Sequence, residues 1–268
     1  MDNFVAQTIK KTIVVLDNSP IHRSKKFKAK IQEWREQDVY GSAQTKFGEL
    51  IIVSDGMGGH NGGRHAAEIA VQIIIEEVTK TNDVNMAKVL QEAILKANEV
   101  IWQESNTNAS LKGMGSTVVA LLITPEKAIC CHVGDSRIYQ IRKGKVLYRT
   151  SDHSQVFDLV RQGKITEEQA RLSDKSNVIT RSLGTKLALN IEITDNLSYK
   201  TGDRFLLCTD GIWSIIPENQ LIEMISEEGD VESVVTNLVE KINTIGITNG
   251  GNHDNLTAAL VEIETSSK

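Results

Sequence analysis

The sequence has no apolar run long enough to cross a membrane. A spanning helix needs roughly 18 consecutive apolar residues, and no stretch of the 268 residues approaches that length. Residues 1–17 also lack a basic stretch followed by an uninterrupted apolar one, so a secretory signal is not expected. These absences favour a cytoplasmic protein that does not engage a membrane.

Cysteine is scarce, and its distribution does not suggest disulfides. The three cysteines are Cys130, Cys131 and Cys208, and all lie inside apolar runs. An odd number in such places indicates buried free thiols in a reducing compartment. Because neighbouring strand residues point to opposite faces, Cys130 and Cys131 are not expected to bind one metal together. The remaining composition, 40% apolar and 24% charged, is that of an ordinary globular protein.

Charge is unevenly distributed along the chain. Residues 1–37 hold eight Lys and Arg against four Asp and Glu, whereas the whole chain has a net charge of −5. Such asymmetry often marks a tail or a segment of different origin. A nucleic-acid-binding role for residues 1–37 is one interpretation, and a solvated basic arm is the simpler one. We do not expect nucleic acid to be the partner.

Secondary-structure signals come in blocks. Apolar spacing predicts helices over residues 64–80, 86–104 and 231–247. Residues 49–54 read as a buried strand, and four β-like runs between residues 116 and 151 follow one another as in an antiparallel meander. Residues 152–176 are polar and predict a mobile lobe. Blocks without strict alternation favour an α+β fold with antiparallel sheets.

Five short patches with aspartate, four of them at the ends of apolar runs, are the most informative feature. They are Glu36-Gln37-Asp38, Asp55-Gly56-Met57-Gly58-Gly59-His60, Gly134-Asp135-Ser136-Arg137, Thr209-Asp210-Gly211 and Asp254-Asn255. A single Asp-Gly pair is more often a plain turn. Several carboxylates brought to one sheet edge would form an oxygen cage, which hard cations such as Mg²⁺ or Mn²⁺ prefer. The joint pattern therefore predicts a metal site assembled from the whole chain.

From about residue 35 to residue 264, the sequence resembles the metal-dependent (PPM-type, type 2C) protein serine/threonine phosphatases in their bacterial form. The matching blocks include ELIIVSDGMGGHNGG, GMGSTVVALLI, CCHVGDSRIYQIRKGKV, DRFLLCTDGIW and GGNHDNLTAALVEI. The resemblance implies two stacked antiparallel sheets flanked by helices on both outer faces, a four-layer α-β-β-α sandwich. It also identifies residues 152–176 with the family's flap.

The resemblance also implies roles for individual residues. Asp55 matches the carboxylate that bridges two metal ions, with the Gly56 carbonyl as a further ligand, and Asp210 and Asp254 match ligands of the first ion. Asp38 matches the acidic residue that serves the second ion, largely through water. Asp135 matches a ligand of a third, weaker ion, to which Asp210 also contributes. Two or three Mn²⁺ or Mg²⁺ ions are therefore expected as cofactors.

The implied reaction is hydrolysis of phosphoserine and phosphothreonine in proteins by a metal-activated water. His60 matches the histidine proposed to protonate the leaving oxygen, since an imidazole can donate a proton near neutral pH. The simpler interpretation is that His60 only braces its loop. The expected partners are phosphorylated proteins, including a bacterial serine/threonine kinase and its substrates, and the expected state is a monomer. His132, in the middle of a strand, is expected to be a core histidine.

The N-terminus departs from the family. Residues 4–37 resemble a fragment of a DDE-type insertion-sequence transposase, with VVLDNSPIHRSKK as the core of the likeness. The expected domains are therefore a transposase-like segment, residues 1–37, and a phosphatase domain, residues 38–268. The segment is expected to supply a substitute edge strand through residues 12–16 or to leave that edge unpaired. Arg35 is the guess for the missing phosphate-binding arginine. The alternative function is an impaired phosphatase fold that binds metal or phosphoprotein without turnover.

Overall fold

The computed structural model describes residues 7–15, 38–57, 62–248 and 255–265. The predicted site residues Arg35, His60 and Asp254 lie outside these ranges.

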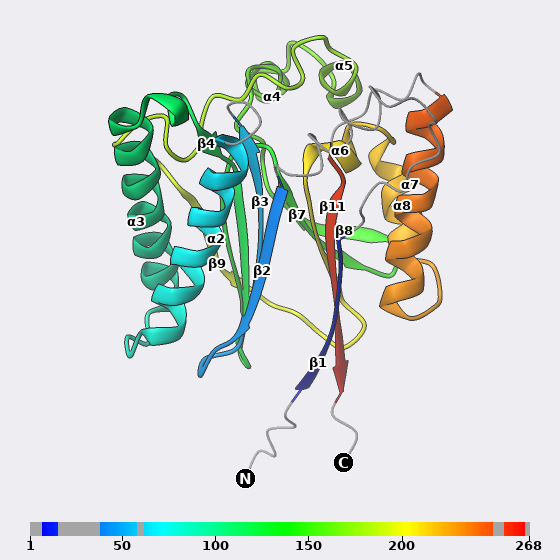
Figure 1. Ribbon diagram of the computed structural model, residues 1–268. Helices are drawn as coiled ribbons and strands as arrows, with labels where there is room; N and C mark the ends of the chain where they lie inside the picture. The colour runs from blue at the N-terminus through cyan, green and yellow to red at the C-terminus, as the bar shows by residue number, and fades with distance from the viewer. Residues whose placement is uncertain (1–6, 16–37, 58–61, 249–254, 266–268) are drawn as a thin grey trace, which may run out of the picture.

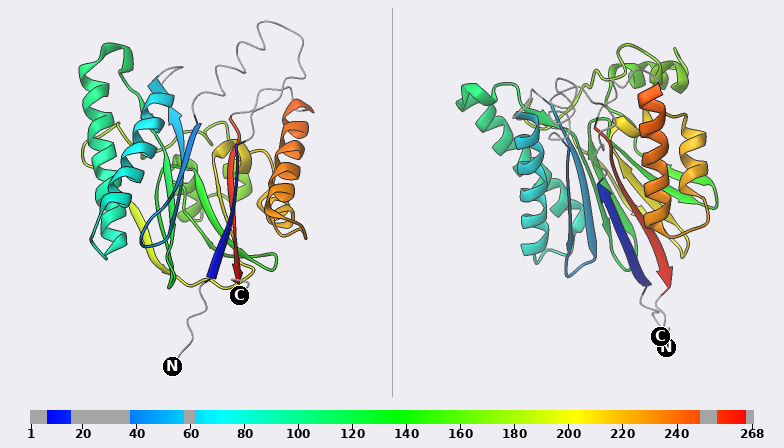
Figure 2. Two further views of the ribbon diagram at one scale, coloured as in Figure 1. Left: turned by 60° about the horizontal axis from the view of Figure 1, so that its bottom comes forward. Right: turned by 45° about the vertical axis from the view of Figure 1, so that its right-hand side comes forward.

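Two antiparallel sheets stack face to face (Figures 1 and 2). One has five strands in the order β1-β11-β10-β7-β8, and the other has the order β2-β3-β5-β6-β9 with the short β4 paired to β3. The strands of the first sheet are β1 (Gln7–Val15), β7 (Arg137–Arg142), β8 (Lys145–Arg149), β10 (Arg204–Cys208) and β11 (Thr257–Thr265). Those of the second are β2 (Asp38–Gln44), β3 (Glu49–Met57), β4 (Gly115–Ser116), β5 (Val118–Ile123), β6 (Ala128–Val133) and β9 (Glu192–Leu197).

Helices cover both outer faces, which confirms the predicted four-layer sandwich (Figure 2). Helices α2 (Gly62–Lys80) and α3 (Met86–Thr107) lie on the β2-to-β9 sheet, followed by a 3-10 turn, η1 (Ala109–Leu111). Helices α7 (Glu218–Ile225) and α8 (Val231–Thr248) lie on the other sheet. Three shorter helices, α4 (Gln155–Arg161), α5 (Glu167–Arg171) and α6 (Asp210–Trp213), gather at one end. In the part of the chain described, no helix is long and apolar enough to cross a membrane.

Successive side chains of a strand point to opposite faces of the sheet. Because both faces of these strands are buried, both carry apolar side chains. In β3, Leu50 and Ile52 pack toward α2 and α3, whereas Ile51 and Val53 pack between the sheets. Cys131 and Cys130 divide in the same way, so the predicted opposite orientation is confirmed and burial raises the pKa of both thiols. Sheets buried on both sides need such continuous apolar runs.

The expected meander between residues 116 and 151 is wrong at its middle link, whereas the pairings of β5 with β6 and of β7 with β8 are confirmed. Strand β6 pairs with β5 and β9, whereas β7 pairs with β10 and β8, so the chain changes sheets between β6 and β7. Gly134 makes this crossover possible: its φ is +106°, and an added Cβ would lie 2.7 Å from Thr117 Cβ. Local spacing cannot reveal the change, because all six residues of β6 and five of the six residues of β7 are buried in either arrangement.

Strand β2 was not predicted, and β3 is longer than predicted. Gly41 and Ser42 weaken the strand signal of β2, yet Gly41 fits there because a Cβ would lie 2.4 Å from Val71 Cγ1 of α2. Strand β3 continues through Asp55 to Met57, since Gly56 and Met57 pair with β4.

At the edge of the five-stranded sheet, β1 pairs with β11 over nine residues, from Gln7 opposite Thr265 to Val15 opposite Thr257. Figure 2 shows these two strands side by side.

Candidate metal centre

The candidate site lies at the end of the sandwich that is uppermost in Figure 1, where β3 and β10 end and β2 and β11 begin. Asp38 is the first residue of β2 and lies directly opposite Asp55 in the β2–β3 register. Asp210 is the first residue of α6, immediately after β10. Asp135 lies in the crossover from β6 to β7 and is buried. Strand ends from both sheets thus bring these four predicted aspartates to one end of the fold.

Asp38 connects the two sheets. Its Oδ2 accepts hydrogen bonds from Thr257 Oγ1 (2.7 Å) and Thr209 Oγ1 (3.1 Å), which belong to the opposite sheet. Thr209 immediately precedes Asp210, the first residue of α6, and both threonines are buried. A carboxylate that accepts two hydroxyl bonds is held in one orientation. The geometry therefore links Asp38 to the loop that carries Asp210.

Buried hydroxyls fix the backbone of Asp55. Its N–H donates to Thr117 Oγ1 (3.1 Å), and its carbonyl accepts from the Thr117 N–H and from Ser116 Oγ (both 2.8 Å). Thr117 Oγ1 is also 2.8 Å from Ser136 Oγ, next to Asp135. Gly63 at the start of α2 packs so closely that an added Cβ would lie 2.9 Å from the Gly56 carbonyl oxygen. These contacts hold the Asp55-Gly56 backbone in place.

Close packing also fixes the start of α6. A Cβ on Gly211 would lie only 1.9 Å from the carbonyl oxygen of Asn255, so only glycine fits there. The Ser214 N–H donates to the Asp210 carbonyl (2.9 Å), completing one helical turn. The packing therefore holds the Asn255 carbonyl against the start of α6, the helix that begins at Asp210.

A buried ion pair is connected to Asp135 through the side chain of Trp213. Arg137 donates two hydrogen bonds to Asp152, from Nε to Oδ1 (2.8 Å) and from Nη2 to Oδ2 (2.7 Å), and a third to the Tyr139 hydroxyl (3.0 Å). Its guanidinium stacks 3.7 Å from the ring centroid of Trp213. The Trp213 Nε1–H in turn donates to the Asp135 carbonyl (3.0 Å). This bidentate geometry leaves the guanidinium little freedom to rotate.

A histidine cluster near Asp135 is better explained by hydrogen bonding than by metal binding. Among the described residues, His132, His153 and Glu192 have ligand atoms within 4.8 Å of one another. His153 accepts from the Gly134 N–H at Nδ1 (3.1 Å), and its Nε2 lies 3.0 Å from Glu192 Oε1 and 3.1 Å from Arg181 Nη1. The Nε2–H of His132 donates to the Ser151 carbonyl (2.9 Å). Both Nε2 atoms are therefore already engaged by neighbouring protein groups.

Burial keeps these two rings neutral. It is the main cause that lowers the pKa of His153 to about 4, with the stacked His132 ring as the next cause. Burial also lowers the pKa of His132. His132 was predicted to be a core histidine, and it is 2% exposed. His153 braces the crossover that carries Asp135, a role that the sequence did not reveal.

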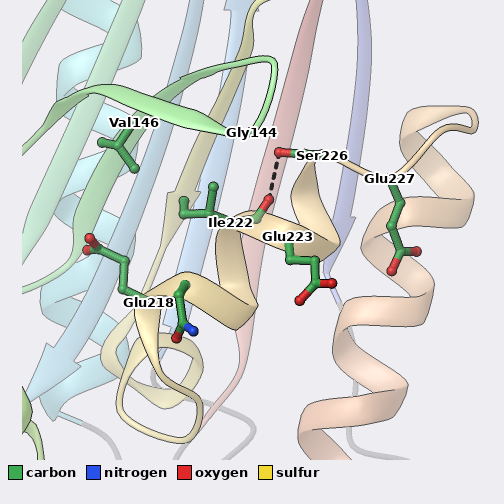
Figure 3. Close-up of a pocket in the computed structure, with 8 residues that line it drawn as sticks. Gly144, Val146, Glu218, Ile222, Glu223, Ser226 and Glu227 are labelled. Carbon is green, nitrogen blue, oxygen red and sulfur yellow. Dashed lines mark hydrogen bonds between the residues drawn. The ribbon is translucent and has the colours of Figure 1, made fainter.

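A hollow of about 610 Å³ lies away from this end of the sandwich, between the β7–β8 hairpin and α7 (Figure 3). Glu218, Glu223 and Glu227 line it together with Val146 and Ile222. It contains none of the four aspartates at the end of the sandwich. Glu218 also accepts a hydrogen bond from Arg149 of β8, so part of its charge is already compensated.

Comparison with known proteins identifies the family. The Protein phosphatase 2C family model matches residues 30–260. The serine/threonine phosphatase stp of Listeria monocytogenes is 31% identical over 223 residues, which cover 82% of this chain and 86% of that protein. The crystal structure of the serine/threonine phosphatase Stp1 from Staphylococcus aureus superposes with a TM-score of 0.81 and 26% identity, and 97% of each chain is covered.

A more distant structure has the same fold. It is the catalytic domain of the serine threonine protein phosphatase PstP in complex with two manganese ions, with a TM-score of 0.71, 23% identity, and coverage of 96% of this chain and 97% of that one. The family match spans most of the sequence and includes Asp38, Asp55, Asp135, Asp210 and Asp254. The chain belongs to the protein phosphatase 2C family.

Proposed function

We propose that this chain hydrolyses phosphoserine and phosphothreonine in proteins at a centre of two or three Mn²⁺ or Mg²⁺ ions. The observation that carries the proposal is the position of Asp38, which lies opposite Asp55 in one sheet and is hydrogen-bonded to Thr209 and Thr257 of the other. Acidic groups from separate loops repel one another unless cations offset their charge. Membership of the phosphatase family supports the same reaction.

The donor set fits hard divalent cations. Asp38, Asp55 and Asp210, with the carbonyl of Gly56, offer only oxygen atoms, which Mg²⁺ and Mn²⁺ prefer. The contact between Gly63 and Gly56 leaves no room for a side chain against that peptide, so its carbonyl position is fixed. Asp254 and Asp135 complete the proposed ligand set. When bound, paired cations lower the pKa of a water and offset charge on a phosphoryl group.

The chain's own residues hold this arrangement and supply the remaining groups. Thr209 and Thr257 orient Asp38, and Thr117 fixes the backbone of Asp55. We propose that His60 donates the proton to the leaving serine or threonine oxygen and that Arg35 contacts the substrate phosphate. Both residues lie outside the described ranges.

The proposed partners are phosphorylated proteins, including a serine/threonine kinase and its substrates, and the proposed state is a monomer. Relatives named serine/threonine phosphatases support the general substrate class. We further propose that residues 1–37 act as a separate N-terminal segment whose strand completes the sheet edge of the domain at residues 38–268. The pairing of β1 with β11 supports the edge-strand role. Family membership does not favour the alternative of a fold without turnover.

The proposal is tested by phosphate release from a phosphothreonine peptide with Mn²⁺. The same peptide with a chelator and a matched phosphotyrosine peptide are the controls. Metal-dependent release from the phosphothreonine peptide, with little from phosphotyrosine, is the expected result. Equal release with the chelator would exclude the proposed metal chemistry.

A further inference from the structure

Trp213 connects the two loops that carry Asp135 and Asp210. It is the last residue of α6, the helix that begins at Asp210, and its side chain is buried, with 3% of the residue exposed. Its Nε1–H donates to the carbonyl oxygen of Asp135 (3.0 Å) in the β6–β7 crossover. This hydrogen bond joins residues 78 positions apart in the chain, beside the neighbouring strands β7 and β10. It therefore fixes one aspartate relative to the other.

The indole ring is itself held on two sides. The Arg137 guanidinium lies 3.7 Å from its centroid and is fixed by the bidentate bond to Asp152. The Phe157 ring of α4 meets the indole edge-on, with centroids 6.2 Å apart and planes at 85°. Cation–π and edge-to-face contacts stabilise a ring in one orientation. The Nε1–H direction is therefore set before any ligand binds.

The opposite end of the same helical turn is also fixed. The Ser214 N–H bonds to the Asp210 carbonyl, and Gly211 lies tightly against Asn255. Helix α6 therefore cannot slide along its axis without a clash. With the helix start fixed and the indole clamped, the Asp135 backbone has a defined position relative to Asp210.

We propose that Trp213 is a positioning residue that sets the separation of Asp135 and Asp210 and so tunes the affinity of the ion that they share. This inference rests on the proposed function, because it takes both aspartates as ligands. Partners that orient metal ligands typically change metal affinity 10- to 100-fold when they are removed. Since Trp213 acts on the main chain of Asp135 and not on its carboxylate, the lower end, about tenfold, is expected.

The test compares Trp213→Phe with Phe157→Leu by calorimetric titration of each full-length protein with Mn²⁺. Trp213→Phe keeps a ring but loses the N–H donor, whereas Phe157→Leu disturbs the same cluster and leaves that donor in place. We expect Trp213→Phe to weaken the lowest-affinity Mn²⁺ site about tenfold, with the other sites unchanged. Phe157→Leu is expected to lower the melting temperature and to weaken that site less than Trp213→Phe does, because the N–H donor and its contact with Arg137 remain. Wild-type affinity at every site in folded Trp213→Phe would overturn the inference.

Fluorescence gives an independent readout that does not need the Trp213 variant to fold. The other tryptophans are Trp34 and Trp102, so the double variant Trp34→Phe, Trp102→Phe retains only Trp213. We expect its emission to change with Mn²⁺ and to saturate with the lowest-affinity site. Emission that follows only the tighter sites, or does not change, would overturn the inference. A wild-type protein that binds no Mn²⁺ would instead overturn the proposed function.

Discussion

At the scale of single residues, the site depends on hydroxyls as much as on carboxylates. Asp38 is oriented by two threonines, and Asp55 by Thr117 and Ser116, all buried or nearly so. Hydrogen bonds to charged groups are stronger than those between neutral groups, and they also fix direction. Metal affinity in this account therefore depends on residues that do not touch the ion.

Thr257→Val tests this dependence. Valine has nearly the shape of threonine but cannot donate to Asp38, so the carboxylate loses its shorter bond of 2.7 Å. We expect half-maximal activity to require about tenfold more Mn²⁺, with Thr257→Ser close to wild type because it keeps the donor. The measurement is turnover against Mn²⁺ concentration. Identical curves for the valine and serine variants would show that this bond does not orient Asp38.

Some site residues are marked by the sequence immediately around them, and others are recognisable only from contacts in the folded structure. Asp55, Asp135 and Asp210 stand beside glycines at the ends of apolar runs, so their positions could be predicted. Thr257 and Trp213 had no such signal, since threonine and tryptophan are ordinary strand and core residues. Their roles arise from contacts between segments far apart in the sequence, which spacing along the chain does not encode.

At the scale of elements, prediction succeeded for helices whose apolar spacing continues over several turns. It failed for strands whose pairing partners are set by tertiary contacts. Helices α2 and α3 have several turns of apolar spacing, and the structure places them within a few residues of the predicted bounds. The meander failed because β6 and β7 are buried on both faces, so their sequences are compatible with either sheet. Only tertiary packing at Gly134 separates the two arrangements.

Strand β1 completes the edge of the five-stranded sheet, and its removal should destabilise the domain. Each cross-strand pair contributes roughly 0.2–1 kcal/mol, and β1 makes nine such pairs with β11. Deletion of residues 1–15 should therefore cost at least about 2 kcal/mol and lower the melting temperature by about 4–8 °C.

Deletion of residues 1–6 is the matched control, because β1 begins at Gln7 and stays whole. Melting is followed by circular dichroism for both truncated proteins. A melting temperature of the longer deletion equal to that of the control would mean that the pairing with β11 contributes no stability.

At the scale of the whole molecule, stability should depend on pH through the two buried histidines. The pKa of His153 is lowered from 6.5 to about 4, mainly by burial, and burial lowers that of His132 as well. The unfolded chain therefore binds more protons than the folded one below about pH 6.5. The stability that these rings contribute is complete above pH 6.5 and is lost as pH falls toward the folded pKa.

Urea unfolding in a chelator should therefore show a falling free energy of unfolding between pH 6.5 and 5. Each ring contributes up to about 1.4 kcal/mol per pH unit, and most carboxylates titrate near pH 4, below this window. The double variant His132→Gln, His153→Gln should have a shallower slope. A wild-type free energy of unfolding that is equal at pH 7 and pH 5 would contradict the assignment of neutral, buried rings.

The central claim is that aspartates from both sheets form a cation-dependent phosphatase centre. The most direct measurement is the rate of phosphothreonine-peptide hydrolysis against Mn²⁺ concentration for wild type, Asp210→Asn and Asp195→Asn. Asp195 lies on β9, is exposed, and provides the same chemical change away from the site. We expect saturable Mn²⁺-dependent turnover in wild type and Asp195→Asn, and a loss of at least about a hundredfold in Asp210→Asn. Undiminished turnover in folded Asp210→Asn would contradict the central claim.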